Sequence, residues 1–274
     1  MFAKNGAYEI YYDTMGAPDA RPLLVIHGLG AQCVEWPQGL LDAFVDAGFY
    51  VIQFDNRDVG LSTKSNGESY LLSDMASDAV AVLDAVGVER AHVFGVSMGG
   101  MIAQTLAIEH PDRVASLTSV MSTTGDPALM GVMSPEAMEM LMTPPPADRD
   151  GYIEHNVASY RAFSGPHFDE VFTRDRVAAK YDRCFDPKGV EAQTLAVGAS
   201  GDRTEKLRAL SVPTTVIHGQ LDGLLGPPHG EATGAAIPDA KLVMLDEMGH
   251  DLPAVYWPIY LEELVTLADR ADAR

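Results

Sequence analysis

Residues 91–100 read AHVFGVSMGG, and residues 101–110 continue as MIAQTLAIEH. The first six letters form an apolar run typical of a buried strand, and the second stretch has the composition of a helix. A Gly-x-Ser-x-Gly sequence at such a junction predicts a tight turn, which holds Ser97 in a strained conformation with its hydroxyl above the end of a sheet. The glycines on either side leave room for the neighbouring strand and helix. We therefore predict that Ser97 is a nucleophile.

The rest of the chain alternates short apolar runs with amphipathic stretches, a pattern typical of parallel strands joined by helices. Helices are expected over Leu72–Val86, over Ser97–Glu109 and from about Ala254 to Ala271. The fold class is therefore α/β, with a mostly parallel sheet and helices on both faces. Strands are expected at Glu9–Asp13, Leu23–His27, Tyr50–Phe54, His92–Val96, Ser116–Met121, Thr214–His218 and Lys241–Leu245.

This alternation stops over residues 123–200, where the pattern predicts helices and no strand. We expect residues 1–122 and 201–274 to form the core, and residues 123–200 to form an inserted helical cap. The insertion is rich in methionine, which suits either an adaptable pocket wall or an ordinary helix core. The methionines are Met130, Met133, Met138, Met140 and Met142, and three prolines follow at 144–146.

Charge and length restrict the functions available. The chain has 274 residues, enough for one large domain with an inserted subdomain. Its 39 acidic and 19 basic residues give a net charge of −20, so nucleic acids and anionic membranes are not expected as partners. Neutral or cationic substrates are favoured over large polyanions. No apolar run approaches the ~20 residues that cross a bilayer, and no signal peptide is recognisable, so we expect a cytoplasmic protein.

The two cysteines, Cys33 and Cys184, lie far apart and outside any metal-binding spacing. A disulfide is not expected in a reducing compartment, and Cys33 is expected to be a small buried filler. No sequence motif for a cofactor or metal stands out. We expect the protein to need neither.

A serine hydroxyl needs a neighbouring base to remove its proton, and His250 is the histidine best placed for this role. It lies in MGHDLP, residues 248–253, in a loop between the last expected strand and the last helix. Loops at the carboxyl ends of parallel strands meet above one edge of the sheet, the same edge at which Ser97 emerges.

The imidazole in turn needs an acid to fix its tautomer. Asp222 closes the segment HGQLD after the penultimate strand, and the order Ser, Asp, His is the one expected for this architecture. Asp126, just after an earlier strand, is the alternative. Asp246 and Asp251 are too near His250 in sequence to approach its far side.

The intermediate of acyl transfer carries an oxyanion, which needs hydrogen-bond donors already in place. The backbone N–H of Met98, directly after the nucleophile, is one predicted donor. The other is the backbone N–H of Leu29 in the loop HGLG, residues 27–30, whose glycines let the chain bend inward. A simple glycine turn is the alternative interpretation of this loop.

Together these motifs resemble the α/β-hydrolase superfamily of serine hydrolases, and the resemblance covers most of the chain outside the insertion. It implies a structural role for Asp55 and Arg57. The motifs that occur in the order of that superfamily are HGLG, the D-x-R-x-x-G-x-S stretch at 55–62, GVSMGG, HGQLD and the final Gly-His.

Longer segments look like bacterial carboxylesterases similar to aclacinomycin methylesterase, whose substrate is a polyketide methyl ester. The resemblance implies a helical cap over the inserted residues. The segments are DNRDVGLST at 55–63, the stretch at 95–125 and TPPPADRDGYIEH at 143–155.

The leading hypothesis is a carboxylesterase that cleaves an apolar, small-molecule ester through an acyl-enzyme on Ser97. A carbon–carbon bond hydrolase, a thioesterase, a lactonase or a perhydrolase could use the same three residues. A non-catalytic receptor for a small ligand is the alternative from a different class. The sequence leaves the substrate and the oligomeric state open.

Overall fold

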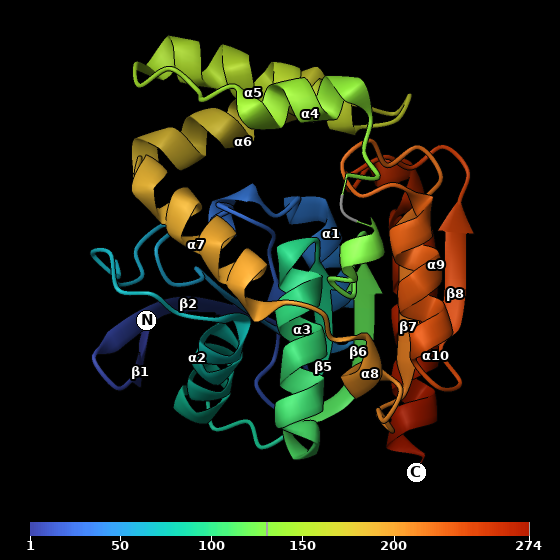
Figure 1. The fold of residues 1–274 in the computed structure, drawn as a ribbon. Coiled ribbons are helices and arrows are strands. Elements are labelled where there is room, and N and C mark those ends of the chain that lie inside the picture. The colour runs from blue at the N-terminus through green and yellow to red at the C-terminus, as the bar shows by residue number, and fades with distance from the viewer. Residues whose placement is uncertain (130, 274) are drawn as a thin grey trace.

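The computed structural model describes residues 1–129 and 131–273, and its centre is an eight-stranded sheet (Figure 1). The strand order is β1-β2-β4-β3-β5-β6-β7-β8. The pairs β1–β2 and β2–β4 are antiparallel, and all other pairs are parallel, as the sequence predicts. The strands are β1 (Phe2–Asn5), β2 (Tyr8–Met15), β3 (Arg21–Ile26), β4 (Phe49–Phe54), β5 (Ala91–Val96), β6 (Val114–Val120), β7 (Thr214–Gly219) and β8 (Lys241–Leu245).

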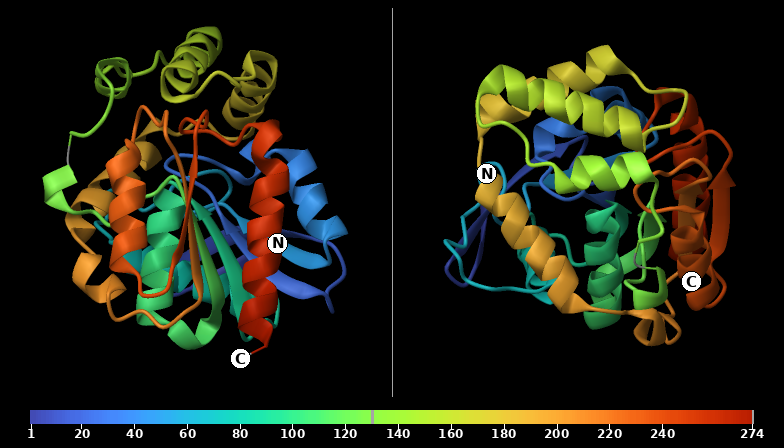
Figure 2. Two further views of the ribbon diagram at one scale, coloured as in Figure 1. Left: turned by 90° about the vertical axis from the view of Figure 1, so that its right-hand side faces the viewer. Right: turned by 45° about the horizontal axis from the view of Figure 1, so that its top comes forward.

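Helices cover both faces of the sheet, and α9 and α10 lie on opposite sides of it (Figure 2). Helices α1 and α10 pack on one face, whereas α2, α3 and α9 pack on the other. The helices are α1 (Gln38–Asp46), α2 (Leu72–Ala85), α3 (Met98–Glu109), α4 (Pro135–Met142), α5 (Arg149–Phe163), α6 (Glu170–Arg183), α7 (Pro187–Ser200), α8 (Thr204–Leu207), α9 (Pro227–Ala236) and α10 (Trp257–Asp272).

The apolar character of the central strands explains this layering. In β3, Leu23 and Val25 join the core beneath α1 and α10, while Leu24 and Ile26 join the core beneath α2 and α3. Successive side chains of a strand point to opposite faces, so a continuous apolar run needs helices on both sides.

Helices α4 to α7, called the cap helices below, lie between β6 and β7 in the chain. Helices α4, α5 and α6 lie above the carboxyl edge of the parallel strands, whereas α7 descends toward α2 (Figure 1). Each cap helix begins at a polar residue whose side chain accepts a hydrogen bond from the first turn. These residues are Ser134, Asp148, Asp169 and Asp186.

All seven predicted strands are present, and the pattern misses β1, α1, α4, α8 and α9. The final helix, expected from about Ala254, starts as a 3-10 turn before α10. Met130 lies outside the described residues. Both cysteines are free thiols, and Cys33 is buried, as expected. No helix in the described part of the chain is long and apolar enough to cross a membrane.

Candidate active site

Ser97 lies at the sharp turn between β5 and α3, with a backbone φ of 56°. This left-handed conformation is strained for a residue with a side chain. A Cβ added at Gly99 would lie 2.0 Å from the carbonyl oxygen of Ile26. A Cβ added at Gly95 would lie 2.3 Å from the carbonyl oxygen of Gly99. The two glycines are therefore required by backbone packing, and the predicted turn is present.

Three side chains from different loops form a chain of hydrogen bonds above this edge of the sheet. Ser97 follows β5, Asp222 follows β7, and His250 lies in the loop after β8. His250 Nε2 is 2.9 Å from Ser97 Oγ, and His250 Nδ1 is 2.7 Å from Asp222 Oδ2. The carboxylate accepts the Nδ1 proton, which leaves Nε2 to accept the proton of the serine hydroxyl. The geometry thus joins a hydroxyl, an imidazole and a carboxylate in one chain of hydrogen bonds.

The carboxylate of Asp222 is buried, and its other oxygen is also occupied. Oδ1 accepts the backbone N–H groups of Leu224 at 2.9 Å and Leu225 at 2.7 Å. These two bonds fix the carboxylate beneath the imidazole. Asp126, the alternative acid, instead accepts the N–H of Ala128 at 2.8 Å and is not bonded to the imidazole.

The residues of the two predicted oxyanion donors adjoin the serine in different ways: Met98 follows it in sequence, and a Cβ added at Gly28, next to Leu29, would lie 3.1 Å from Ser97 Cβ. Within residues 1–129 and 131–273, the N–H groups of Leu29 and Met98 donate no hydrogen bond to the protein. Leu29 lies in the loop that passes over Ser97, and this loop is tied to α7 because the N–H of Gly30 donates to Gln193 Oε1 at 2.8 Å. Two amide donors at such a position are what a developing oxyanion needs.

Two other buried histidines, His218 in β7 and His229 in α9, have structural partners. His218 Nε2 lies 2.7 Å from the carbonyl oxygen of Leu225, and His229 Nδ1 lies 2.9 Å from Thr123 Oγ1. Burial lowers the pKa of both imidazoles, which favours their neutral forms. Among the described residues, no three His, Cys, Asp or Glu side chains gather as metal ligands would.

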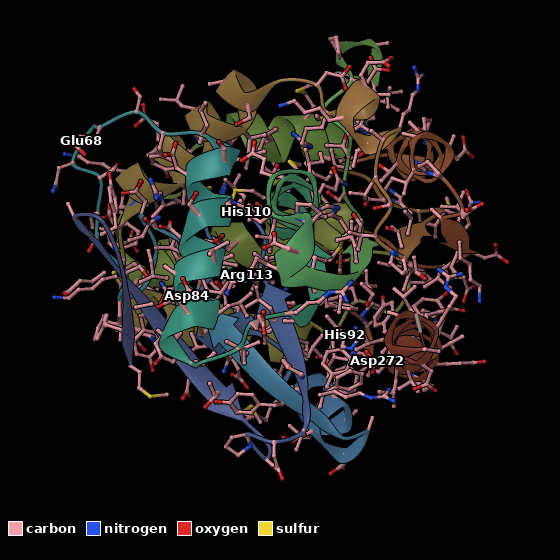
Figure 3. All side chains as sticks on the ribbon, turned by 90° about the horizontal axis from the view of Figure 1, so that it is seen from below. Glu68, Asp84, His92, His110, Arg113 and Asp272 are labelled. Atoms are coloured by element: carbon pink, nitrogen blue, oxygen red, sulfur yellow. The ribbon has the colours of Figure 1, made fainter. Side chains whose placement is uncertain are left out.

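A second Ser–His–Asp arrangement lies at the opposite edge of the sheet, where His92 and Asp272 meet (Figure 3). His92 Nδ1 is 2.9 Å from Ser116 Oγ, and His92 Nε2 is 3.4 Å from Asp272 Oδ1. The side chain of Ser116 has no exposure to solvent, and neither it nor His92 lines the large cavity. No acyl group could reach that hydroxyl, so access distinguishes the two sites.

A cavity of about 600 Å³ lies between the cap helices and the sheet edge, and Ser97 and His250 line it. Its lining is mostly apolar, which suits a small organic molecule. Met140 is part of the lining. Met138 and Met142 are exposed instead, so only part of the methionine cluster serves as a pocket wall.

Two cations of α6 that the sequence analysis does not single out, Arg176 and Lys180, also line the cavity. They are four residues apart, and this spacing places them on one helix face. Lys180 Nζ lies 3.6 Å from Glu35 Oε2, and both side chains are buried. Burial lowers the pKa of Lys180, but Glu35, Tyr152 and Tyr160 together outweigh burial, and the net shift is upward. The guanidinium of Arg176 stacks 4.2 Å from the ring centre of Tyr160.

The Asp55 and Arg57 stretch makes structural contacts. Asp55 Oδ1 accepts the N–H of Cys33 at 2.8 Å, and Asp55 Oδ2 lies 2.7 Å from Arg183 Nη1 at the end of α6. Arg57 forms a buried ion pair with Asp78, with 2.6 Å between nitrogen and oxygen. The first of these ion pairs ties a cap helix to the core.

Residues 21–254 match the family described as the alpha/beta hydrolase fold, and the chain belongs to this family. It is similar to the rhodomycin D methylesterase of Streptomyces peucetius, with 30% identity over 93% of each chain. Among solved structures it resembles an N-acyl homoserine lactone degrading enzyme, with 27% identity, a TM-score of 0.76 and coverage of 97% and 99%. The meta-cleavage product hydrolase of Pseudomonas fluorescens shares the fold, with a TM-score of 0.80, 18% identity and coverage of 99% and 98%.

Proposed function

We propose that this protein is a carboxylesterase, with Ser97 as nucleophile, His250 as general base and Asp222 as the orienting acid. The observation that carries the proposal is the chain of hydrogen bonds of 2.9 Å and 2.7 Å that joins these side chains. Two of them, Ser97 and His250, line the cavity between the cap helices and the sheet edge. The similarity to a rhodomycin D methylesterase supports an ester as substrate.

In the first half of the reaction, His250 Nε2 removes the proton of Ser97 as Oγ attacks the ester carbonyl carbon. The carbonyl oxygen becomes an oxyanion and accepts the N–H groups of Leu29 and Met98. The intermediate collapses when the imidazolium gives its proton to the leaving alcohol, and an acyl-enzyme remains. In the second half, His250 activates a water molecule in the same way, and the carboxylic acid leaves.

The substrate is proposed to be a small, largely apolar ester, because the cavity has about 600 Å³ and a lining surface that is mostly apolar. Residues 123–200 are proposed to act as a cap that shapes this cavity. Neither nucleic acid nor membrane is proposed as a partner, and no cofactor is required by these steps. A cytoplasmic location remains a prediction from the sequence.

A fluorophosphonate probe tests the proposal, because it reacts only with an activated serine hydroxyl. We expect stoichiometric labelling of the wild type and none of Ser97→Ala. Ser116→Ala is the matched control, because Ser116 also lies beside a histidine but is buried without access. We expect this variant to label like the wild type. Absence of labelling in folded wild-type protein would favour a non-catalytic receptor.

The type of bond that the protein cleaves is identified by measuring kcat/KM for p-nitrophenyl esters, thioesters, lactones and a vinylogous diketone. The proposal predicts the highest kcat/KM for the oxygen esters. A preference of tenfold or more for another bond would assign the same side chains to a thioesterase, a lactonase or a carbon–carbon bond hydrolase instead.

A further inference from the structure

Arg176 lies in the wall of the cavity and has no ion-pair partner among the described residues. Its guanidinium carbon lies 4.2 Å from the ring centre of Tyr160 and 5.4 Å from that of Phe172. The Nε atom is buried, and it has no hydrogen-bond partner in the described part of the chain. No carboxylate of the described residues lies within 4.0 Å of this side chain. The stacking therefore fixes the plane of the guanidinium but leaves its N–H groups for another acceptor.

His27 supplies a second unused donor on the same cavity wall. Its Nδ1 accepts the N–H of Gly28 at 2.8 Å, so the proton of the neutral imidazole is on Nε2. Nε2 is buried, and the residue is 8% exposed. Among the described residues Nε2 has no hydrogen-bond partner within normal geometry, although the nearby backbone of Glu35 acts to raise the pKa of the imidazole. Burial, together with the charges of Arg176 and Lys180, lowers the pKa of His27 to about 3. The imidazole is therefore neutral and offers one N–H.

The other charged residues that line the cavity are Lys180, Asp186, Glu191 and Asp251. Lys180 is already paired with Glu35. Burial raises the pKa of Asp251, the carboxyl group next to His250, which disfavours its charged form. Glu191 lines the cavity too but is exposed to solvent. Arg176 is therefore the cation of this wall that has no carboxylate within 4.0 Å among the described residues.

We propose that Arg176, together with the Nε2–H of His27, forms a subsite that binds a carboxylate carried by the substrate. The inference rests on the proposed ester hydrolysis and narrows its substrate class to esters whose acyl part ends in a carboxylate. A planar guanidinium binds a carboxylate through two parallel hydrogen bonds, and burial strengthens them. A bound carboxylate would also accept hydrogen bonds from two buried donors, Arg176 Nε–H and His27 Nε2–H.

The position of the subsite limits the length of the substrate. His27 is the first residue of the oxyanion loop, and Asp251 directly follows His250. Arg176, His27, Asp251 and Ser97 all line one cavity of about 600 Å³. We therefore expect half-esters of short dicarboxylic acids to fit this cavity better than esters of long-chain acids.

Kinetics on matched esters test the subsite. The p-nitrophenyl half-esters of succinic, glutaric and adipic acid are compared with the p-nitrophenyl esters of butanoic, pentanoic and hexanoic acid. In Arg176→Gln, we expect the ratio of kcat/KM for the acidic over the neutral ester to fall about 10- to 100-fold, mainly through KM. Arg176→Lys should restore part of the ratio because it keeps the charge.

Arg174→Gln is the matched control on the same helix, because Arg174 is paired with Glu154 at the surface. It should leave the ratio at the wild-type value. An equal loss on both esters in Arg176→Gln would show that the arginine only packs against its aromatic neighbours. That result would overturn the subsite, as would wild-type kcat/KM on both esters.

Binding to Ser97→Ala separates this inference from the proposed function. Calorimetry with monomethyl adipate and methyl hexanoate should show tighter binding of the acid, and Arg176→Gln in the same background should abolish the difference. If the wild type cleaves no ester but this difference appears, the subsite stands and the esterase proposal fails. If esters are cleaved and no difference appears, the esterase proposal stands and the subsite fails.

Discussion

The backbone N–H of His250 donates a 2.7 Å hydrogen bond to the carbonyl oxygen of Phe163, the last residue of α5. The contact continues along the chain, since a Cβ added at Gly249 would lie 2.4 Å from the backbone nitrogen of Gly165. The loop that carries the proposed base is therefore held from above by a cap helix as well as from below by the sheet.

The proposed orienting role of Asp222 predicts the effect of Asp222→Asn. The amide cannot accept the Nδ1 proton in the same way, so the imidazole adopts the wrong tautomer and kcat should fall about 10³- to 10⁴-fold. Ester hydrolysis under saturating substrate measures the loss. Asp126→Asn, which changes the alternative acid, should retain wild-type kcat, and a comparable loss in that variant would contradict the assignment.

The turn at Ser97 predicts opposite outcomes for two glycine substitutions. Gly99→Ala forces a methyl group against the carbonyl oxygen of Ile26, so we expect a lower melting temperature and loss of ester hydrolysis. Gly198→Ala lies inside α7 with no atom within 4 Å of the added Cβ, and it should stabilise by about 0.5–1 kcal/mol. Thermal unfolding distinguishes them; equal melting temperatures would show that the turn has room to spare.

The ion pair of Arg183 and Asp55 predicts a stability cost when it is broken. Arg183→Met leaves the buried Asp55 carboxylate without its cation, so the free energy of unfolding should fall by about 3 kcal/mol. Urea denaturation followed by fluorescence measures the change. Arg149→Gln breaks the surface pair with Asp182 and should leave the midpoint unchanged. Similar midpoints for the two variants would indicate that Asp55 needs no counterion.

The lowered pKa of His27 predicts a pH dependence of stability. Because the pKa is about 3 in the folded protein and 6.5 in the unfolded chain, only the unfolded chain binds this proton between those values. The free energy of unfolding therefore rises with pH across this window, by at most about 1.4 kcal/mol per pH unit from this group, and is lost as pH falls. Urea denaturation at pH 7 and pH 5 should show a smaller difference in His27→Gln than in the wild type. Equal differences would mean that His27 is already protonated when folded.

The central sheet is predictable from the sequence because its strands are apolar on both faces. The element β1 is not, because its four residues lie at the sheet edge and only Ala3 is buried. Helix α9 is missed because Pro227, Pro228 and several glycines suggest a loop, although prolines fit the first turn of a helix. Short elements of this kind are set by their neighbours rather than by their own pattern.

The proposed triad is equally accessible to sequence analysis, because each member follows a strand in a short motif. The charged residues of the cavity wall cannot be recognised from the sequence in this way. Arg176 and Glu35 are ordinary charged residues in the sequence, and the first becomes noteworthy only when the fold places it against Tyr160. The bond from His250 to Phe163 has no signal at all, since it joins two backbone groups and any residue could supply them.

The chain leaves the sheet after β6 and returns at β7, and these strands are paired neighbours, with Leu117 opposite Thr214. The inserted helices thus begin and end at nearby points, so a transplanted segment of another length need not disturb the strand register. A functional chimaera would still have to bring two attachments with it: a cation to neutralise Asp55 and a main-chain acceptor to hold the histidine loop.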